Sequence, residues 1–351
     1  MGRVVLVTGV SRDLGGRFAR RLAGQPSIDR VIGVDVVPPR QNLGDVAFVR
    51  ADIRNPVIAK VIAGQAVDTV VHLSVQASPN EVGRAGGRTS MKEHNVIGTM
   101  QLLAACQKAP GLERLVVRSS GAVYGSSSRD PAMFTEDMSA KAMPRSGYGK
   151  DVLEVEGYVR GFARRRPDVA VTTLRAASAV GPTVTSRLTQ YFRLPVVPTV
   201  LGYDARLQFL HENDLLGVLE HATLGGVHGT FNIAGDGVLL LSQCSRRLGR
   251  PTVPLLLPAV TWAGSLVRTL GMTDFSPEQI RLLTHGRVVA TDQMRETLGF
   301  QPKYTTAETF ADFASGQGPG LLPPEALAGA VDRVAALAAK GSGHLPTQSA
   351  N

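Results

Sequence analysis

The first 35 residues carry the pattern that most constrains the fold of this 351-residue chain. Residues Val4–Thr8 form an uncharged, β-branched run, which is typical of a strand buried on both faces. A glycine-bearing turn follows over residues 8–16, and the apolar residues after it recur at helical spacing, with Phe18 and Leu22 on one face. A second apolar strand, Val31–Asp35, ends in an acid. Strand, glycine turn, helix and strand in this order predict a βαβ unit.

The turn and the terminal acid are suited to binding a dinucleotide. Gly9 and Gly15 allow the backbone to approach a pyrophosphate, and the following helix offers unpaired N–H groups and a positive dipole end. Asp35 lies about 20 residues past the last glycine, where an acid accepts the hydroxyls of the adenosine ribose. Arg12 stands at the middle glycine of the G-x-x-G-x-x-G pattern, and Leu14 belongs to the same predicted cofactor-binding turn. The alternative interpretation is an ordinary tight βα turn.

Arg12 and Asp35 make opposite predictions about the cofactor. The guanidinium of Arg12 is able to meet the 2′-phosphate of NADP. The carboxylate of Asp35 repels that phosphate. The sequence therefore favours NAD, with NADP as the alternative.

Composition restricts the class of protein. The net charge is +9, but the arginines are scattered and aromatic residues make up 5% of the chain, so we expect no nucleic-acid function. Cys106 and Cys244 have no metal or redox spacing, which predicts a reducing cytoplasm and no metal site. The first strand begins too early to leave room for a signal peptide. The longest apolar stretch, 253–267, contains prolines and is too short for a bilayer, so we expect no membrane contact.

Strands and helices alternate up to about residue 178, which predicts an α/β fold with a doubly wound parallel Rossmann sheet. We expect a dinucleotide-binding domain over 1–178, with long helices at about 90–108 and 148–166. A smaller C-terminal substrate lobe follows over 179–315, with segments that return to the sheet. Residues 316–351 are predicted to be a linker and a tail helix.

Several motifs then recur in a fixed order. Residues Asn95–Thr99 read N-V-x-G-T, residues Ser119–Gly125 read S-S-x-x-V-Y-G, and residues Leu298–Pro302 read L-G-x-x-P. Over about residues 3–315 the chain resembles the extended short-chain dehydrogenase/reductases, the NAD-dependent epimerase/dehydratase family, which includes the UDP-glucose 4-epimerases. The resemblance implies that more residues bind the cofactor, namely Asp52 and Ile53 at the adenine, and Leu73, Ser74, Asn95, Ser119, Tyr148 and Lys150.

The chemistry of such a site needs a phenol and a hydroxyl beside the nicotinamide, which itself exchanges the hydride. The resemblance implies that Ser120 supplies the hydroxyl and Tyr148 the phenol. The family motif Y-x-x-x-K places a lysine four residues after the tyrosine, but Val152 stands there. Lys150 is the available lysine, and it lies roughly 200° around the helix from Tyr148. Either the helix begins late enough for Lys150 to reach back, or the activating lysine is absent.

The substrate side departs further from the family pattern. Ser178 stands where the sugar-nucleotide enzymes have an asparagine before Gly-Pro. Leu207 and Gln208 stand where those enzymes begin an R-D-F/Y-I-H run, and Arg206 lies one residue early, on the opposite face of a strand. Ser178 and Arg206 are therefore the predicted substrate residues.

Three functions are compatible with these residues. The first is an NAD-dependent epimerase or dehydratase that acts on a nucleotide sugar as its small-molecule substrate. The second is an oxidoreductase of an apolar alcohol or ketone, as in the hydroxysteroid dehydrogenase relatives, which would explain the apolar run at 254–270. The third is an NAD-binding protein with weakened or lost catalysis. Relatives pair through the two long helices, which implies a homodimer.

Overall fold

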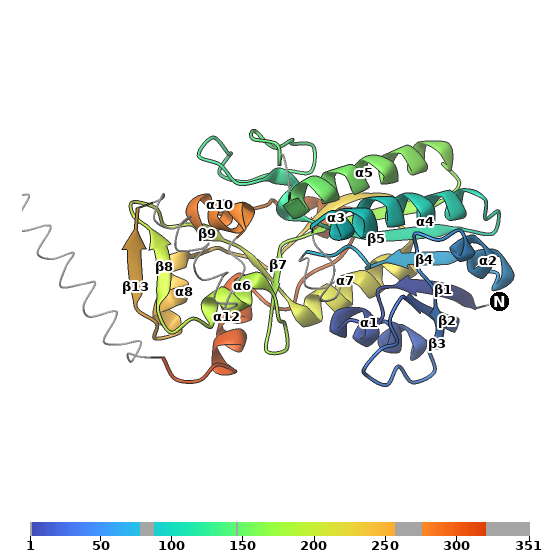
Figure 1. Cartoon of the computed structure of the whole chain (residues 1–351), viewed down its shortest axis with the longest axis horizontal. Coiled ribbons are helices and arrows are strands. Elements are labelled where there is room, and N and C mark those ends of the chain that lie inside the picture. Colours follow the sequence, from blue (N-terminus) through green and yellow to red (C-terminus); the bar gives the residue numbers. More distant parts are fainter. Residues whose placement is uncertain (1, 78–87, 145–146, 257–275, 321–351) are drawn as a thin grey trace, which may run out of the picture.

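The computed structural model describes residues 2–77, 88–144, 147–256 and 276–320. A seven-stranded sheet forms the centre, with strand order β11-β6-β5-β4-β1-β2-β3 and every pair parallel (Figure 1). Its strands are β1 (Arg3–Thr8), β2 (Ile28–Asp35), β3 (Ala47–Arg50), β4 (Thr69–His72), β5 (Arg114–Ser120), β6 (Ala170–Ala176) and β11 (Gly229–Ile233). The predicted doubly wound Rossmann sheet is confirmed.

Helices cover both faces of this sheet. One face carries α2 (Val57–Gly64), α3 (Arg88–Lys92), the π-helical turn η2 (Glu93–Ile97), α4 (Gly98–Gln107) and α5 (Gly147–Arg165). The other face carries α1 (Asp13–Ala23), α7 (Glu212–Gly225) and the short α11 (Asp292–Glu296). The helix predicted over about 90–108 is therefore interrupted by one wider turn.

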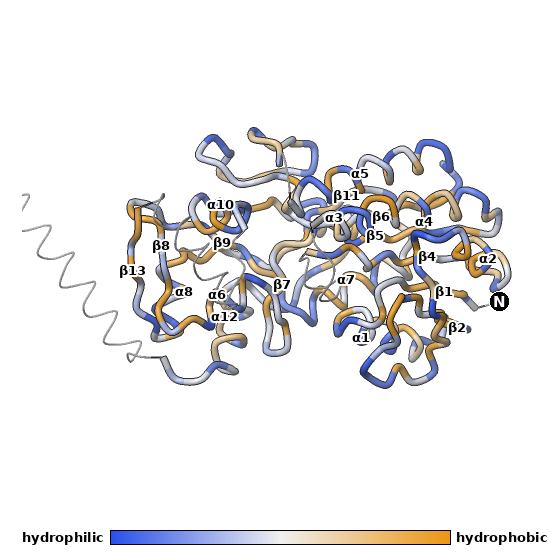
Figure 2. Tube along the Cα trace, viewed as in Figure 1, coloured by the Kyte–Doolittle hydropathy of each residue, from blue (hydrophilic) through white to orange (hydrophobic). Residues whose placement is uncertain are grey.

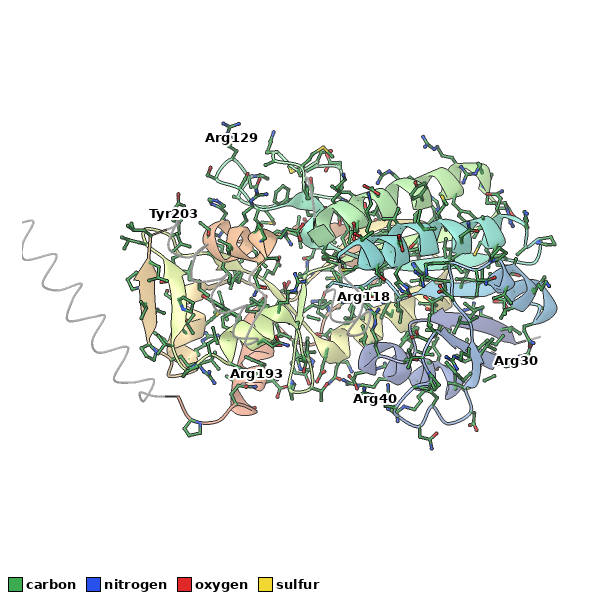
Figure 3. The ribbon with its side chains drawn as sticks, in the orientation of Figure 1. Arg30, Arg40, Arg118, Arg129, Arg193 and Tyr203 are labelled. Atoms are coloured by element: carbon green, nitrogen blue, oxygen red, sulfur yellow. The ribbon has the colours of Figure 1, made fainter. Side chains whose placement is uncertain are left out.

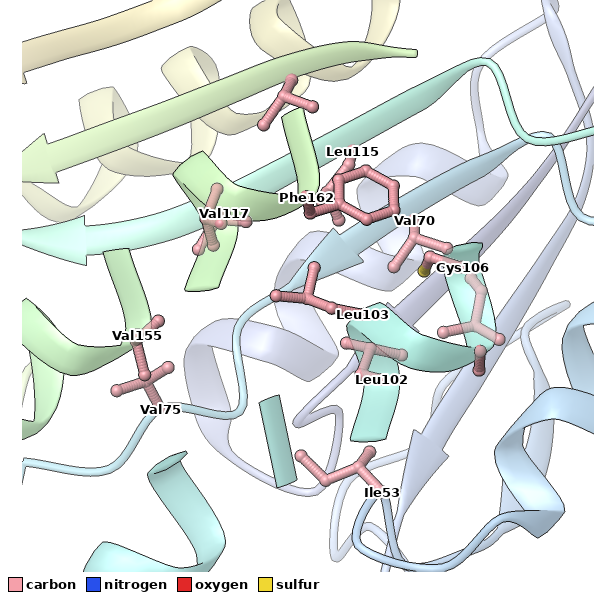
Figure 4. Packing of buried hydrophobic residues seen from close by; sticks show 14 of the residues in the cluster. Ile53, Val70, Val75, Leu102, Leu103, Cys106, Leu115, Val117, Val155 and Phe162 are labelled. Carbon is pink, nitrogen blue, oxygen red and sulfur yellow. The ribbon is translucent and has the colours of Figure 1, made fainter. Parts of the chain in front are cut away.

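Apolar residues of the strands fill the two layers beneath these helices. Figure 4 shows Leu102, Leu103 and Phe162 of α4 and α5 packed against Leu115 and other residues of the sheet. Cys106 is fully buried in the same cluster. In Figure 2 the central strands are mainly orange, whereas the outer turns of α5 are mainly blue or white. The hydrophobic pattern of the strands thus follows their burial on both faces.

The second lobe is built from short elements beside the carboxyl edge of the sheet (Figure 1). Its strand pairs are β7 (Ser178–Val180) with β10 (Phe209–His211), β9 (Arg206–Leu207) with β12 (Leu239–Leu240), and β8 (Val197–Val200) with β13 (Thr252–Leu255). Its helices are α6 (Arg187–Phe192), α8 (Leu241–Arg247), α10 (Pro277–His285) and α12 (Thr306–Ser315). Phe192, Phe209, Phe310 and Phe313 form its core.

The chain crosses between the lobes more than once. Strand β11 is the edge strand of the large sheet, and α7 packs against α1, although both follow residue 178. The boundary between residues 178 and 179 stays a prediction. The tail helix expected at about 324–340 and most of the apolar run at 254–270 lie outside the described residues.

Candidate functional site

The turn between β1 and α1 forms a backbone cradle. Gly9 has φ +82°, and a Cβ atom there would lie 3.1 Å from the carbonyl carbon of Leu73 and from the Cα atom of Ser74. A Cβ atom at Gly15 would lie 2.1 Å from the carbonyl oxygen of Gly9. Both positions therefore require glycine, which keeps the turn tight and brings the start of α1 to the carboxyl ends of β1 and β4.

Asp35 at the end of β2 is fixed beside this cradle. One carboxylate oxygen accepts a hydrogen bond from the backbone N–H of Ser11 at 3.0 Å, and the other accepts from the N–H of Val36 at 2.8 Å. Each oxygen keeps acceptor capacity for a further donor. The binding of a ribose by Asp35 stays a prediction.

Arg12 immediately precedes α1 and reaches across to the end of β4. Its two terminal nitrogens donate to the carbonyl oxygens of Ser74 at 3.3 Å and Val75 at 3.4 Å. Leu14, two residues further, is half-buried and packs against the apolar layer under α1. The positive charge of Arg12 is thus held over the carboxyl edge of the sheet.

Two buried histidines lie below that charge. His72 hydrogen-bonds Thr8 at 2.8 Å and Thr99 at 2.9 Å, and burial lowers the pKa of His72 to about 3. His94 hydrogen-bonds the hydroxyl of Ser74 at 2.7 Å, and burial followed by the charge of Arg12 lowers the pKa of His94. Both imidazoles are therefore neutral at pH 7 and serve the structure of this edge.

The other residues assigned to the cofactor from the resemblance lie at the same edge, each with partners in the protein. Asp52 pairs with Arg54 at 2.7 Å, and the hydrogen bond from Arg54 holds the pKa of that carboxyl below its usual value. Ile53 is buried against Gly98, where a Cβ atom would lie 2.8 Å from the Ile53 side chain. The amide of Asn95 bonds both backbone groups of Gln76, at 2.9 and 2.7 Å. Their contact with a cofactor stays a prediction.

Ser119 belongs to a buried polar network under α5. Its hydroxyl donates to Glu156 at 2.5 Å, and Arg175 of β6 donates to the same carboxylate at 2.8 Å. Arg175 also donates to the hydroxyl of Tyr124 at 2.8 Å, and that hydroxyl donates to Asn232 at 2.8 Å. The structure thus directs the Ser119 side chain to the interior of the protein, because it alternates with its neighbours along β5. Its predicted role in cofactor binding stays a prediction.

Ser120 lies at the end of β5, where a short helix packs against the start of α5. The hydroxyl of Ser120 accepts from the N–H of Ala122 at 3.2 Å and begins the short helix η3 (Gly121–Tyr124). A Cβ atom at Gly149 would lie 2.9 Å from the carbonyl oxygen of Ala122, so the first turn of α5 packs directly on η3. Tyr148 is half-buried on that first turn and packs against the apolar layer under α5.

The second lobe holds the start of α5. Glu278 of α10 accepts hydrogen bonds from the N–H groups of Tyr148 at 3.1 Å and Gly149 at 3.2 Å. A carboxylate at a helix N-terminus satisfies unpaired donors and offsets the helix dipole. A residue 130 positions away in the sequence therefore positions the predicted phenol, and no pattern in the sequence identifies it.

Lys150 points away from Tyr148. Its side chain is 44% exposed and its ammonium lies 3.8 Å from Glu154, one turn along α5. Val152 is fully buried in the apolar layer under α5. This arrangement fits the alternative in which the activating lysine of the family motif is absent.

Arg287 of the second lobe, rather than Lys150, is the cation near the start of α5. It donates to the carbonyl oxygen of Gly125 at 2.7 Å and to the hydroxyl of Ser126 at 3.2 Å. Its side chain passes 3.4 Å from where a Cβ atom of Gly121 would lie. Burial lowers the pKa of Arg287 to about 10, with Glu278 and Tyr148 among the groups that oppose this shift. The guanidinium is therefore positively charged at pH 7 and within electrostatic range of Tyr148, and no motif in the sequence identifies it.

Of the two predicted substrate residues, one lines a pocket beside this cation. Ser178, Gln208 and Arg287 are the polar side chains of a small pocket between the sheet edge and the second lobe. Arg206 is exposed, and its guanidinium donates to the carbonyl oxygen of Ala132 at 3.1 Å. As the strand alternation predicted, Arg206 and its buried neighbour Leu207 face opposite sides.

Fold and cradle together define a dinucleotide-binding Rossmann protein, and the glycine turn with Asp35 fits such a cofactor. No group of three metal-ligating side chains occurs within the described ranges. No helix in those ranges is long and apolar enough to cross a bilayer. Residues 5–234 match the NAD dependent epimerase/dehydratase family, and the chain belongs to that family.

Individual relatives extend over most of the chain. An uncharacterised protein of Mycobacterium tuberculosis (strain ATCC 25618 / H37Rv) is 51% identical over 320 residues, which cover 90% of this chain and 84% of the relative. The UDP-glucose 4-epimerase of Thermotoga maritima, solved with UDP-glucose, has TM-score 0.68 at 18% identity and covers 89% of this chain and 98% of its own. The dTDP-glucose 4,6-dehydratase of Bacillus anthracis, solved with NAD, has TM-score 0.66 at 19% identity and covers 90% and 96%. These two likenesses show the fold.

Proposed function

We propose that this protein is an NAD-dependent enzyme that epimerises or dehydrates the sugar of a nucleotide sugar. The observation that carries the proposal is the packing of the first turn of α5, which carries Tyr148, on the short helix that Ser120 begins at the carboxyl end of β5. Family membership and the structures of relatives with NAD and with UDP-glucose support it.

Asp35 favours NAD over NADP. Its carboxylate is held over the turn by Ser11 and would repel a 2′-phosphate, whereas it accepts hydroxyl groups well. Arg12 donates toward the end of β4 and so lies on the pyrophosphate side of the cradle. When bound, NAD supplies a hydride acceptor at its nicotinamide ring.

The protein's own residues handle the proton. Tyr148 takes the proton of the sugar hydroxyl as the carbon beneath it is oxidised, and Ser120 donates a hydrogen bond to the same oxygen. A positive charge near a phenol favours its ionised form. Arg287 supplies that charge in place of the absent lysine, because Lys150 is turned to Glu154.

The test is turnover of UDP-glucose, UDP-galactose and dTDP-glucose by purified protein with NAD, read by chromatography of the products. Tyr148→Phe is expected to abolish turnover without changing the melting temperature by more than a few degrees. Tyr203→Phe, an exposed tyrosine of the second lobe, is the matched control and should retain full activity. Unchanged turnover in Tyr148→Phe would exclude this mechanism.

The orientation of Lys150 favours one second candidate, an NAD-binding protein with weakened or lost catalysis. This candidate predicts saturable NAD binding with no product from any of the three sugars. The apolar-alcohol alternative has no observation in its favour within the described residues.

A homodimer is also proposed. Ile97 of η2 and Tyr158 of α5 are 41% and 40% exposed on helices that the family resemblance assigns to pairing. Light scattering should give a particle mass of twice the chain mass of 37.2 kDa, and Tyr158→Arg should reduce the particle mass to that of a single chain. The cytoplasmic location stays a prediction.

A further inference from the structure

Arg118 has no partner within the described part of the chain. It is partly buried near the end of β5, its Nε atom is buried without a hydrogen-bond acceptor, and it forms no ion pair there. Arg114 and Arg250, whose Nε atoms are also unsatisfied, each pair through another nitrogen, with Glu113 and the carbonyl oxygen of Leu194. Partly buried guanidinium groups are normally paired, because removing a charge from water is costly.

The register of the sheet places Arg118 beside the cradle. His72 and Val117 are partners in the β4–β5 ladder, so Arg118 lies next to Leu73. The backbone of Leu73 in turn touches the Gly9 turn. Because neighbouring strands are about 4.8 Å apart, the backbone of Arg118 lies on the order of 10 Å from that turn. Figure 3 shows Arg118 near the centre of the molecule, where the first lobe meets the second.

The side chain of Arg118 lies on the face of the sheet that carries α1. Along β5 it alternates with Val117, which packs under α4 and α5, and shares its side with Val116, which packs under α1 and α7. The N-terminus of α1, with its positive dipole end, opens at the same crevice. Arg12 adds a second cation at that edge.

We propose that Arg118 binds the pyrophosphate of the dinucleotide, opposite the N-terminus of α1. The inference rests on the cofactor-binding part of the proposed function. A guanidinium donates charge-assisted hydrogen bonds to phosphate oxygens and is the side chain best matched to them in geometry. Arg118 immediately precedes the S-S-x-x-V-Y-G motif and is not part of it.

The experiment is calorimetric titration of the full chain with NAD, ADP-ribose, adenosine and UDP-glucuronate. Arg118→Met keeps most of the aliphatic volume and removes the charge. Arg118→Lys keeps the charge but lacks the planar, multi-donor guanidinium group. Arg30→Met, at the opposite end of the first lobe, is the matched control for the loss of one positive charge (Figure 3). Circular dichroism and the melting temperature establish that each variant is folded.

Arg118→Met is expected to weaken NAD and ADP-ribose by the same factor, about 10- to 100-fold, and adenosine by less than 2-fold. Arg118→Lys should recover part of the affinity, and Arg30→Met should behave like the natural protein. Unchanged ADP-ribose affinity in Arg118→Met overturns the assignment. A loss confined to UDP-glucuronate also overturns it, because the guanidinium would then bind the substrate.

The two proposals fail separately. If ADP-ribose binding depends on Arg118 but no sugar nucleotide is turned over, the assignment of Arg118 holds and the proposed enzymatic function is refuted. If a sugar nucleotide is turned over but Arg118→Met does not change the affinity for ADP-ribose, only the assignment of Arg118 is refuted. A natural protein that binds neither NAD nor ADP-ribose removes both.

Discussion

Replacing Arg175 by methionine should destabilise the protein strongly, because it leaves a buried carboxylate without its main partner. Glu156 is 2% exposed and receives two nitrogens of Arg175, at 2.8 and 3.0 Å. Breaking a buried ion pair by removing one partner costs about 3–5 kcal/mol. With an unfolding entropy of about 2.1 cal/mol/K per residue, that corresponds to a fall in melting temperature of roughly 4–7 °C for the 351-residue chain. Calorimetry or thermal circular dichroism measures it directly.

The matched control is Arg160→Met. Arg160 pairs with the same carboxylate at 3.4 Å, but its side chain is 59% exposed, so its loss should cost about 0–1 kcal/mol. The double variant Glu156→Gln with Arg175→Met should regain much of the lost stability, since no buried charge remains. If Arg175→Met costs no more than Arg160→Met, the network does not stabilise the fold as described.

Three further results are expected. As the pH falls from 6 to 4, His72 should lower the free energy of unfolding by about 1.4 kcal/mol per pH unit. The reason is that its folded pKa of about 3 keeps the buried imidazole neutral, whereas the unfolded imidazole takes up a proton. This contribution should be absent in His72→Gln. Burial raises the pKa of Cys106 to about 12 and also raises that of Cys244, so neither thiol should react with a thiol reagent at pH 8 until urea is added, and labelling of the native protein would contradict their burial. Glu278→Ala should lower the free energy of unfolding by about 1 kcal/mol, and it should lower kcat because the turn that carries Tyr148 is held less firmly. Glu278→Asp should lower kcat less. An unchanged kcat in Glu278→Ala would show that the contact is structural only.

Local patterns were sufficient to predict the fold. The signals were the βαβ unit at the start, the alternation of strands and helices, and the apolar runs, each of which extends over a few residues. A continuous apolar run fits a strand of a parallel sheet, because such a strand is buried on both faces. The site was predictable where it depends on the same local features. Gly9 and Asp35 lie in a turn whose conformation is set by neighbouring residues, so their positions follow from spacing.

Contacts between distant segments were not predictable. Glu278 and Arg287 reach the start of α5 only because the second lobe packs against the sheet edge. Ser119 is assigned to the cofactor because it begins a family motif, whereas the direction of its side chain is set by strand alternation and by Glu156 on α5. A motif identifies the strand end, but the tertiary contact decides what each of two adjacent hydroxyls bonds.

The absence of a lysine four residues after Tyr148 has a structural explanation in the packing of α5. Val152 is fully buried in the apolar layer, so an ammonium at that position would lie among aliphatic side chains and cost several kcal/mol unless paired. Under the proposed function, a positive charge for the phenol would come from outside α5, and Arg287 of the second lobe would supply it. Glu278 from that lobe also accepts hydrogen bonds from the helix N-terminus. The proposed phenol and its charge partner would then be brought together by the packing of the two lobes, which would couple chemistry at Tyr148 to the position of the second lobe.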